Sequence, residues 1–156
     1  MKSLASALLV LAACGSNSNV AGDYTIALTN RDNGCKLSNW TVGNQTTGVT
    51  VTMTQSGSDV TAMVKGGGGL ALGALLGTSS FTGDDSIDLK ALGSRPNQSG
   101  NCTWTFNAEI TGDLSGDVLT GRIDYRAADN GNPDCTTMGI HGCDSYQDFN
   151  GTRPPQ

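Results

Sequence analysis

Apolar residues alternate with small or polar ones at a period of two along most of the chain after residue 21. In the first such run, Tyr24, Ile26 and Leu28 are separated by Ala27 and Thr25. This alternation places the apolar side chains on one face of a β-strand. Because runs of Gly, Asn, Asp and Ser separate the repeats, the pattern predicts short antiparallel strands joined by turns. We expect these strands around residues 24–28, 40–42, 49–53, 60–64, 87–89, 102–110, 119–125 and 146–149.

The parity of the apolar positions predicts how one hairpin pairs. A two-residue loop at Ser56 and Gly57 places Met53 opposite Val60, and the remaining apolar residues of both strands then share one face. A sheet with one buried face specifies its register in this way. A further hairpin over residues 81–89 needs a loop with an odd number of residues, and Gly83-Asp84-Asp85 supplies three.

A second two-residue loop is expected at residues 115–116. It places Ile110 opposite Gly121 on the apolar face and Glu109 opposite Arg122 on the polar face. Opposite charges facing each other across an antiparallel pair are favourable. A slip by one residue would bury both charged side chains, so the face of each strand is well specified.

The chain is therefore predicted to be an all-β protein. Its fold is expected to be a small antiparallel up-and-down β-barrel of about eight strands, with a two-sheet β-sandwich as the alternative. The barrel is favoured because the clearest hairpins join sequential neighbours through tight turns. The opening Gly22-Asp23-Tyr24 resembles the glycine-x-aromatic start of lipocalin-like barrels, with Tyr in place of the usual Trp.

The N-terminus carries a different pattern. Ten uncharged, mostly apolar residues follow Lys2 and Ser3, a run typical of a secretory signal, and they end in Leu11-Ala12-Ala13-Cys14. A ten-residue helix spans roughly 15 Å, about half of a bilayer core, so the run does not predict a transmembrane helix. The final four residues resemble the lipobox of bacterial lipoproteins, and Cys14 is then the lipidated residue. An ordinary signal peptide cleaved near Ala13 is the alternative.

The lipobox resemblance implies a location as well as a modification. Residues 1–13 would be removed as a signal peptide, residues 14–21 would form a lipidated tether, and residues 22–156 would form a single β-barrel domain. Gly15 stands where some lipoproteins carry an inner-membrane retention aspartate. We therefore expect a lipid anchor in the outer membrane, at its periplasmic face or at the cell surface.

The charge balance excludes one class of partner. The chain has a net charge of −5, from nine basic and fourteen acidic residues, and removal of Lys2 with the signal leaves −6. Proteins that bind nucleic acid through its phosphates need clustered Lys and Arg, so no nucleic-acid partner is expected. The mature length suits one domain, and a monomer is expected.

Four cysteines remain once Cys14 is assigned to the lipid. In an exported chain they are expected to form disulfides, and four cysteines permit three connectivities. The short spacing of Cys135 and Cys143 favours a local bridge, which leaves Cys35 to pair with Cys102. A rival interpretation makes Cys135, His141 and Cys143 zinc ligands, but a fourth ligand is not evident.

Residues 66–77 form a glycine- and leucine-rich run without a charged or hydrogen-bonding side chain. One interpretation is a flexible connection whose leucines plug an end of the barrel. The other is a mobile apolar lid that contacts a ligand, a partner or a membrane, because exposed apolar surface usually marks a contact. Together with apolar residues of the later strands, this run supplies the candidate ligand contacts: Leu70, Leu72, Leu75, Leu76, Trp104, Phe106 and Tyr125.

Signals for catalysis and metal binding are weak. The aspartates at 84, 85 and 88 and the polar loop 129–134 lack calcium-loop spacing and are explained by turn formation. The chain has one histidine, His141, and neither a Gly-x-Ser-x-Gly nor a His-Glu-x-x-His motif. We expect no enzyme activity, no cofactor and no metal.

The leading hypothesis is a lipid-anchored envelope β-barrel that acts as a non-catalytic binding module for a small apolar ligand or a protein. One alternative is an inhibitor of a secreted enzyme such as a lysozyme-type cell-wall hydrolase, by analogy with small disulfide-bonded barrel lipoproteins of that kind. A structural envelope lipoprotein is the other. A hollow barrel favours the first hypothesis, a rigid protruding loop the second, and a filled barrel with a featureless rim the third.

Overall fold

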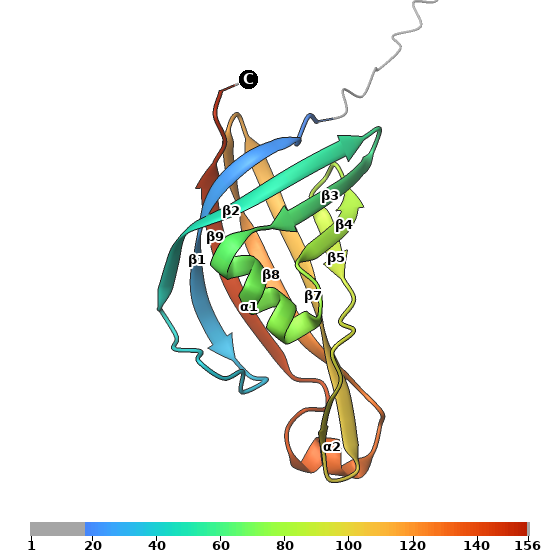
Figure 1. Ribbon diagram of the computed structural model, residues 1–156. Helices are drawn as coiled ribbons and strands as arrows, with labels where there is room; N and C mark the ends of the chain where they lie inside the picture. The colour runs from blue at the N-terminus through green and yellow to red at the C-terminus, as the bar shows by residue number, and fades with distance from the viewer. Residues whose placement is uncertain (1–17, 156) are drawn as a thin grey trace, which may run out of the picture.

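The computed structural model describes residues 18–155, which form a closed antiparallel β-barrel (Figure 1). Each strand of the wall pairs with the wall strand that follows it in sequence, and the barrel closes where the last strand pairs with the first. The predicted up-and-down barrel is therefore confirmed. Eight strands form the wall, and a ninth, β6, extends the edge beside β7. The signal peptide and Cys14 lie outside the described residues. The elements are β1 (Gly22–Asn33), β2 (Gln45–Ser56), β3 (Asp59–Val64), α1 (Gly66–Leu76), β4 (Ser80–Asp84), β5 (Asp88–Ala91), β6 (Asn97–Ser99), β7 (Cys102–Ser115), β8 (Val118–Asp129), α2 (Pro133–Thr137) and β9 (Asp144–Thr152).

The two tight hairpins keep the predicted strand faces but have a different register. Their loops are Gly57-Ser58 and Gly116-Asp117, one residue later than expected, so Met53 pairs with Ala62 instead of Val60. The reason is the turn type, since each loop has a glycine with positive φ (65° and 61°) at its first position. A type II′ turn requires glycine there. Each register therefore moves by two residues, which leaves the buried face unchanged.

The same shift changes the partners of Glu109. This residue pairs in register with Asp124 on β8 and with Lys90 on β5, so the predicted pairing with Arg122 is wrong. Its carboxylate lies 3.1 Å from the Lys90 ammonium, and a more distant Arg126 guanidinium approaches it at 3.9 Å. The hairpin between β4 and β5 has a three-residue loop as expected, but at residues 85–87.

One end of the barrel is filled with side chains, and we call it the closed end. It carries the β2–β3, β4–β5 and β7–β8 turns and both ends of the described chain (Figure 1). Tyr24, Phe81, Leu89 and Leu119 are fully buried there. Val20, within the segment expected to be a tether, is also fully buried, and its carbonyl accepts a hydrogen bond from the Tyr24 hydroxyl at 2.8 Å.

The glycine-rich run is neither a flexible connection nor a loop but the eleven-residue helix α1. It contacts β2 and β3 on one side and β7 on the other, with Leu72 and Leu76 buried. Its glycines explain how closely it approaches the wall: a Cβ on Gly68 would lie 2.8 Å from a Val49 methyl, and one on Gly69 would collide with the Val64 carbonyl. Within residues 18–155, neither helix is long and apolar enough to cross a bilayer.

Candidate functional site

The opposite end of the barrel, which we call the open end, contains a cavity of about 820 Å³. Its wall is built by the inward faces of β1, β2, β7, β8 and β9, by one side of α1, by the connection 34–44 and by residues after α2. A volume of this size suits a small organic ligand. The wall is mainly aliphatic and aromatic, from Ile26, Leu28, Leu37, Trp40, Val49, Val64, Ala71, Leu72, Ala74, Leu75, Trp104, Phe106, Ile123, Tyr125, Met138 and Ile140.

Three polar side chains in this wall bond to one another. The Tyr125 hydroxyl donates to Gln147 Oε1 at 2.8 Å, and Gln147 Nε2 donates to Asn30 Oδ1 at 2.7 Å. Burial raises the pKa of the Tyr125 phenol, so it stays a neutral hydrogen-bond donor. The Trp40 and Tyr125 rings pack in a T-shaped arrangement, with 5.9 Å between their centroids. This part of the wall is thus fixed in place by its own contacts.

Five of the seven predicted ligand contacts line the cavity. Leu72 and Leu75 reach it from α1, Trp104 and Phe106 from β7, and Tyr125 from β8. The other two do not line it. Leu70 is exposed on the outer side of α1. Leu76 is fully buried in the core, and its carbonyl accepts hydrogen bonds from the connection between β5 and β6. The difference follows from the helix, which divides the leucines between two faces.

The apolar pattern of the sequence does not reveal the polar part of the wall. Asn30 and Gln147 both occupy inward positions, because Asn30 continues the series from Tyr24 and Gln147 precedes the buried Phe149 by two. A polar residue at an inward strand position was the available signal. The connection 34–44 was also misread, since its residues 40–42 form no strand; Trp40 instead donates its indole N–H to the Arg31 carbonyl at 2.8 Å.

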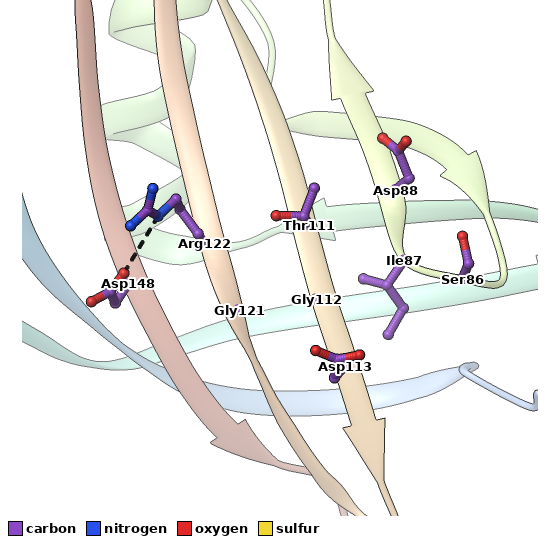
Figure 2. Close-up of a pocket in the computed structure, with 9 residues that line it drawn as sticks. All are labelled: Ser86, Ile87, Asp88, Thr111, Gly112, Asp113, Gly121, Arg122 and Asp148. Carbon is purple, nitrogen blue, oxygen red and sulfur yellow. Dashed lines mark ion pairs between the residues drawn. The ribbon is translucent and has the colours of Figure 1, made fainter.

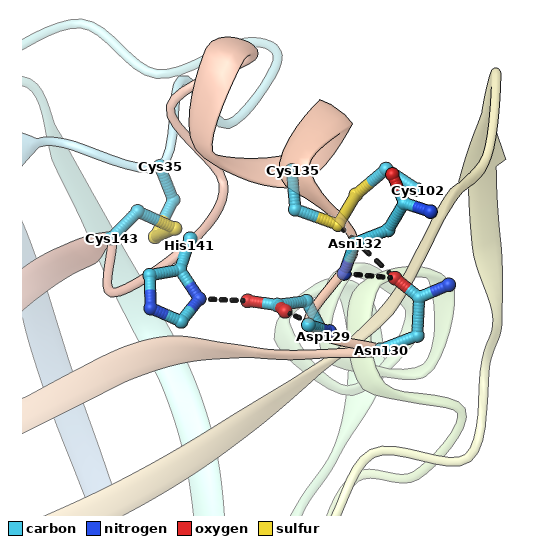
Figure 3. A network of polar contacts seen from close by, with 9 residues as sticks. Cys35, Cys102, Asp129, Asn130, Asn132, Cys135, His141 and Cys143 are labelled. Atoms are coloured by element: carbon cyan, nitrogen blue, oxygen red, sulfur yellow. Dashed lines mark hydrogen bonds and ion pairs between the residues drawn. A yellow bond between two sulfur atoms is a disulfide. The ribbon is translucent and has the colours of Figure 1, made fainter.

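Two disulfides stand beside the cavity, as expected in number but not in pairing. Cys35 bonds to Cys143, and Cys102 bonds to Cys135, so the predicted pairs Cys35–Cys102 and Cys135–Cys143 are wrong (Figure 3). The cause is the closure of the barrel. Asn33 at the end of β1 pairs with Ser145 at the start of β9. Because the strands are antiparallel, the residue two positions after Asn33, Cys35, lies opposite the residue two positions before Ser145, Cys143.

The segment 129–143, which includes α2, projects beyond the barrel as a separate lobe (Figure 1). Asn132 caps α2 by accepting from the Asp134 backbone N–H at 3.0 Å, and Asp134 accepts from both N–H groups of Asn101. His141 Nδ1 lies 3.0 Å from Asp129 Oδ2 (Figure 3). The loop 129–134 is therefore a set of side-chain-to-backbone turns. Neither the zinc nor the calcium candidates assemble: no cluster of three metal-ligating side chains occurs among residues 18–155.

A second hollow of about 420 Å³ lies on the outer face of the barrel, across β5, β7, β8 and β9 (Figure 2). Gly112 and Gly121 form its floor, while Asp88, Arg122 and Asp148 lie at its edges. The Asp148 carboxylate is already paired with two guanidinium groups, from Arg122 at 3.8 Å and from a second arginine at 2.7 Å. This outer hollow is shallow and open to solvent on one side, so the barrel cavity is the stronger candidate site.

The two sites differ in what they offer a ligand. The outer hollow presents paired charges at the surface, whereas the barrel cavity presents apolar walls, an internally satisfied polar network and a covalently fixed rim. Comparisons with protein-family models, with curated proteins and with solved structures find no match to this chain, so the geometry alone carries the functional argument.

Proposed function

We propose that this protein is a lipid-anchored, non-catalytic binding module of the bacterial envelope that holds a small, mainly apolar ligand inside its barrel. The observation that carries the proposal is the cavity of about 820 Å³ with its aliphatic and aromatic wall. Burial of a ligand's apolar surface provides the driving force, at about 25 cal/mol per Å². The wall is built mainly from strands, from the helix α1 and from disulfide-linked connections, so binding requires little ordering of the protein.

The chain reports on this cavity without added labels. Its two tryptophans, Trp40 and Trp104, both line the cavity, so a bound ligand is expected to change the intrinsic fluorescence. Titration with the apolar dye N-phenyl-1-naphthylamine should give a saturable signal at one dye per protein. A linear, non-saturating signal would contradict an enclosed site.

A pair of variants locates the dye. Leu28 and Ala27 are neighbours on β1, but only Leu28 lines the cavity. Leu28→Trp adds volume inside and is expected to weaken dye binding at least tenfold, while Ala27→Trp adds the same side chain outside and should leave the affinity unchanged. Equal affinities for both variants would place the dye elsewhere and overturn the proposed site.

The anchor proposal gives the barrel an orientation. Cys14 precedes Ser18, the first described residue, by four positions, a distance of at most about 14 Å. Ser18 lies at the closed end, where its carbonyl accepts a hydrogen bond from Gln55. With Cys14 lipidated, the closed end would face the membrane and the open end the aqueous compartment. Intact mass spectrometry of the membrane-fraction protein tests this through loss of residues 1–13 and added acyl mass on Cys14.

One observation favours a second candidate function, the inhibition of a secreted enzyme. The lobe 129–143 protrudes from the open end and is held by both disulfides and by the contacts of Asp134 and His141. Rigid projecting loops pay little ordering entropy when they bind a protein. Assays of cell-wall hydrolases with added protein test this function. A deletion is unnecessary, because Thr136→Arg alters the exposed surface of the lobe at a residue that does not line the cavity. Loss of inhibition in that variant would assign the contact to the lobe.

A further inference from the structure

The basic residues of this acidic protein are divided into two groups. Eight of the nine lie in residues 18–155, since Lys2 precedes them. Five form ion pairs with carboxylates, whereas Lys36, Lys65 and Arg95 have no carboxylate within ion-pair distance among the described residues. The five paired residues are Arg31, Lys90, Arg122, Arg126 and Arg153.

Two of the three unpaired cations stand at the cavity. Lys36 and Arg95 both line it, and both are exposed, so they lie at its mouth and not in its depth. Among the described residues that line the cavity, none is acidic. The mouth is thus locally positive although the whole chain carries a net charge of −5. A cleft of one charge sign with low-dielectric walls attracts ligands of the opposite charge.

A buried donor in the cavity wall has no acceptor among residues 18–155, whereas Lys36 Nζ donates to the Met138 carbonyl at 3.5 Å. Trp104 Nε1 is buried and forms no hydrogen bond within residues 18–155. Trp104 pairs in register with Asn97 on β6, Arg95 precedes Asn97 by two residues, and both Trp104 and Arg95 line the cavity. Leaving a buried donor unsatisfied is unfavourable, because the N–H loses its hydrogen bond to water without gaining another. A ligand oxygen beside the indole would satisfy it.

The polar network inside the cavity needs no acceptor or donor from a ligand. Gln147 uses its amide oxygen for Tyr125 and its amide nitrogen for Asn30, so these groups already satisfy one another. Two cations without a carboxylate partner, Lys36 and Arg95, therefore lie at the mouth, and the apolar walls lie beneath them. This arrangement matches a ligand with an apolar body and one oxygen-rich, negatively charged end.

On the basis of the proposed ligand-binding function, we propose that the ligand is an anionic amphiphile, whose apolar chain fills the barrel and whose carboxylate or phosphate head is bound at the mouth by Arg95, Lys36 and the Trp104 indole N–H. Guanidinium groups suit both kinds of head because their planar donors match carboxylate and phosphate oxygens.

The test compares ligands that differ only in the head. Displacement of bound N-phenyl-1-naphthylamine is measured for dodecanoate, dodecyl phosphate, dodecanol and dodecyltrimethylammonium, all below their micellar concentrations. We expect both anions to bind at least tenfold more tightly than the alcohol, and the cation to bind most weakly. Only the affinities of the anions should fall as salt is added, because the cations at the mouth are exposed. The tighter anion distinguishes a fatty-acid from a phosphate-bearing source.

Variants assign the head to the mouth. Arg95→Gln should weaken dodecanoate about tenfold and leave dodecanol unchanged, since it removes a charged donor that only the anionic head uses. Trp104→Phe removes the N–H and leaves a smaller aromatic ring; the loss of the donor should weaken the anion more than the alcohol. Lys65→Gln is the matched control, because Lys65 is an unpaired, exposed cation that does not line the cavity; it should change neither affinity.

The outcomes separate this inference from the proposed function. If dodecanol binds as tightly as dodecanoate and Arg95→Gln changes neither, the head-group assignment is overturned while ligand binding stands. If neither the dye nor any of the four compounds binds, the proposed function itself fails.

Discussion

The two ends of the barrel are stabilised in different ways. At the closed end, large side chains such as Phe81 and Leu119 are fully buried and the strands are joined by two- or three-residue loops. At the open end, the connections are long, a cavity of about 820 Å³ replaces part of the core, and both disulfides are found. Packing thus stabilises one end, and covalent bonds stabilise the other.

The difference teaches how the barrel accommodates a cavity. An unfilled volume in a core forfeits dispersion contacts and costs stability in proportion to its size. A disulfide stabilises mainly by restricting the unfolded chain, so it needs no dense packing around it. Cys35 itself lines the cavity, which places one of the cross-links in the wall that packing supports least.

Removing the disulfides should produce the largest effect. The Cys35–Cys143 bond joins residues 108 apart, and the Cys102–Cys135 bond joins residues 33 apart. The chain-entropy estimate assigns them about 5 and about 4 kcal/mol. We expect the double variant Cys35→Ser with Cys143→Ser to be the less stable of the two pair replacements in urea denaturation. Dye affinity should also fall in both, because each bond fixes the rim.

The contradictory result would be a loss of stability below about 1 kcal/mol for either pair. The open end would then be held by packing after all, and the contrast between the two ends would disappear. Reduction of the unmodified protein with dithiothreitol under native conditions provides an independent check, since it breaks the bonds without changing the sequence.

Two phenylalanines sharpen the comparison at the level of packing. Phe81 is fully buried at the closed end, whereas Phe106 lines the cavity and therefore has fewer packing partners to lose. Phe81→Ala should cost about 4 kcal/mol and Phe106→Ala about half of that. If Phe81→Ala does not fold, the milder pair Phe81→Leu and Phe106→Leu gives the same ranking. Dye affinity should change only for the Phe106 variants; equal stability losses would contradict the contrast.

The strand faces could be predicted from the sequence, but the registers could not. Alternation assigned the inward positions of both hairpins correctly, because a shift by two residues returns every side chain to the same face. The turn type selects between the possible registers, because a type II′ turn needs glycine at its first loop position. Gly57 and Gly116 occupy that position. Turn chemistry therefore decides the register that hydrophobic patterning leaves open.

The site was harder to predict because it is made by closure and by a helix. Pairing of the first strand with the last brings Cys35 to Cys143, a contact implied by any closed barrel but not by spacing along the chain. Helix α1 was missed because glycine has poor helix propensity. Here tertiary contact outweighs that propensity, since Gly68 and Gly69 admit the helix against β2 and β3. The inward Asn30 carried a readable signal that apolar patterning ignores.

The closed end also has one polar anchor, and breaking it should have a moderate effect. The Arg153 side chain is only 8% exposed; its guanidinium bonds the Asn19 and Ala21 carbonyls at 2.9 and 2.7 Å and pairs with Asp117 at 3.1 Å. Arg153→Met should cost about 2 kcal/mol, because those acceptors lose a charged donor. Hydrogen exchange at Val20 should accelerate as the entering segment loosens.

Arg126→Met is the matched control for this prediction. Its guanidinium is 61% exposed and lies 3.9 Å from Glu109, so its removal should cost less than about 0.5 kcal/mol. If the two variants are equally stable, the closed end does not depend on its buried guanidinium, and burial of Val20 with the hydrogen bonds of Tyr24 and Gln55 suffices to hold the N-terminal segment.

Alkaline titration compares one buried tyrosine from each end and should give the smallest effect near neutral pH. Burial raises the pKa of Tyr125 at the open end and also that of Tyr24 at the closed end, where Arg153 opposes the rise. A raised phenol pKa means that the folded state keeps a proton which the unfolded state releases above about pH 10. The contribution of these two tyrosines to stability should therefore be constant below pH 9 and fall above pH 10, by up to about 1.4 kcal/mol per pH unit for each tyrosine.

The two tyrosines should contribute unequally to that fall. Because no cation offsets the burial of Tyr125, Tyr125→Phe should flatten the alkaline loss more than Tyr24→Phe, even though it also removes the hydrogen bond to Gln147. Urea denaturation at half-unit steps from pH 8 to about pH 11 measures both slopes. The opposite result would be a larger reduction of the alkaline stability loss in Tyr24→Phe than in Tyr125→Phe. It would mean that Arg153 does not favour the ionised phenol at the closed end, and that the open end admits water to Tyr125 before the protein unfolds.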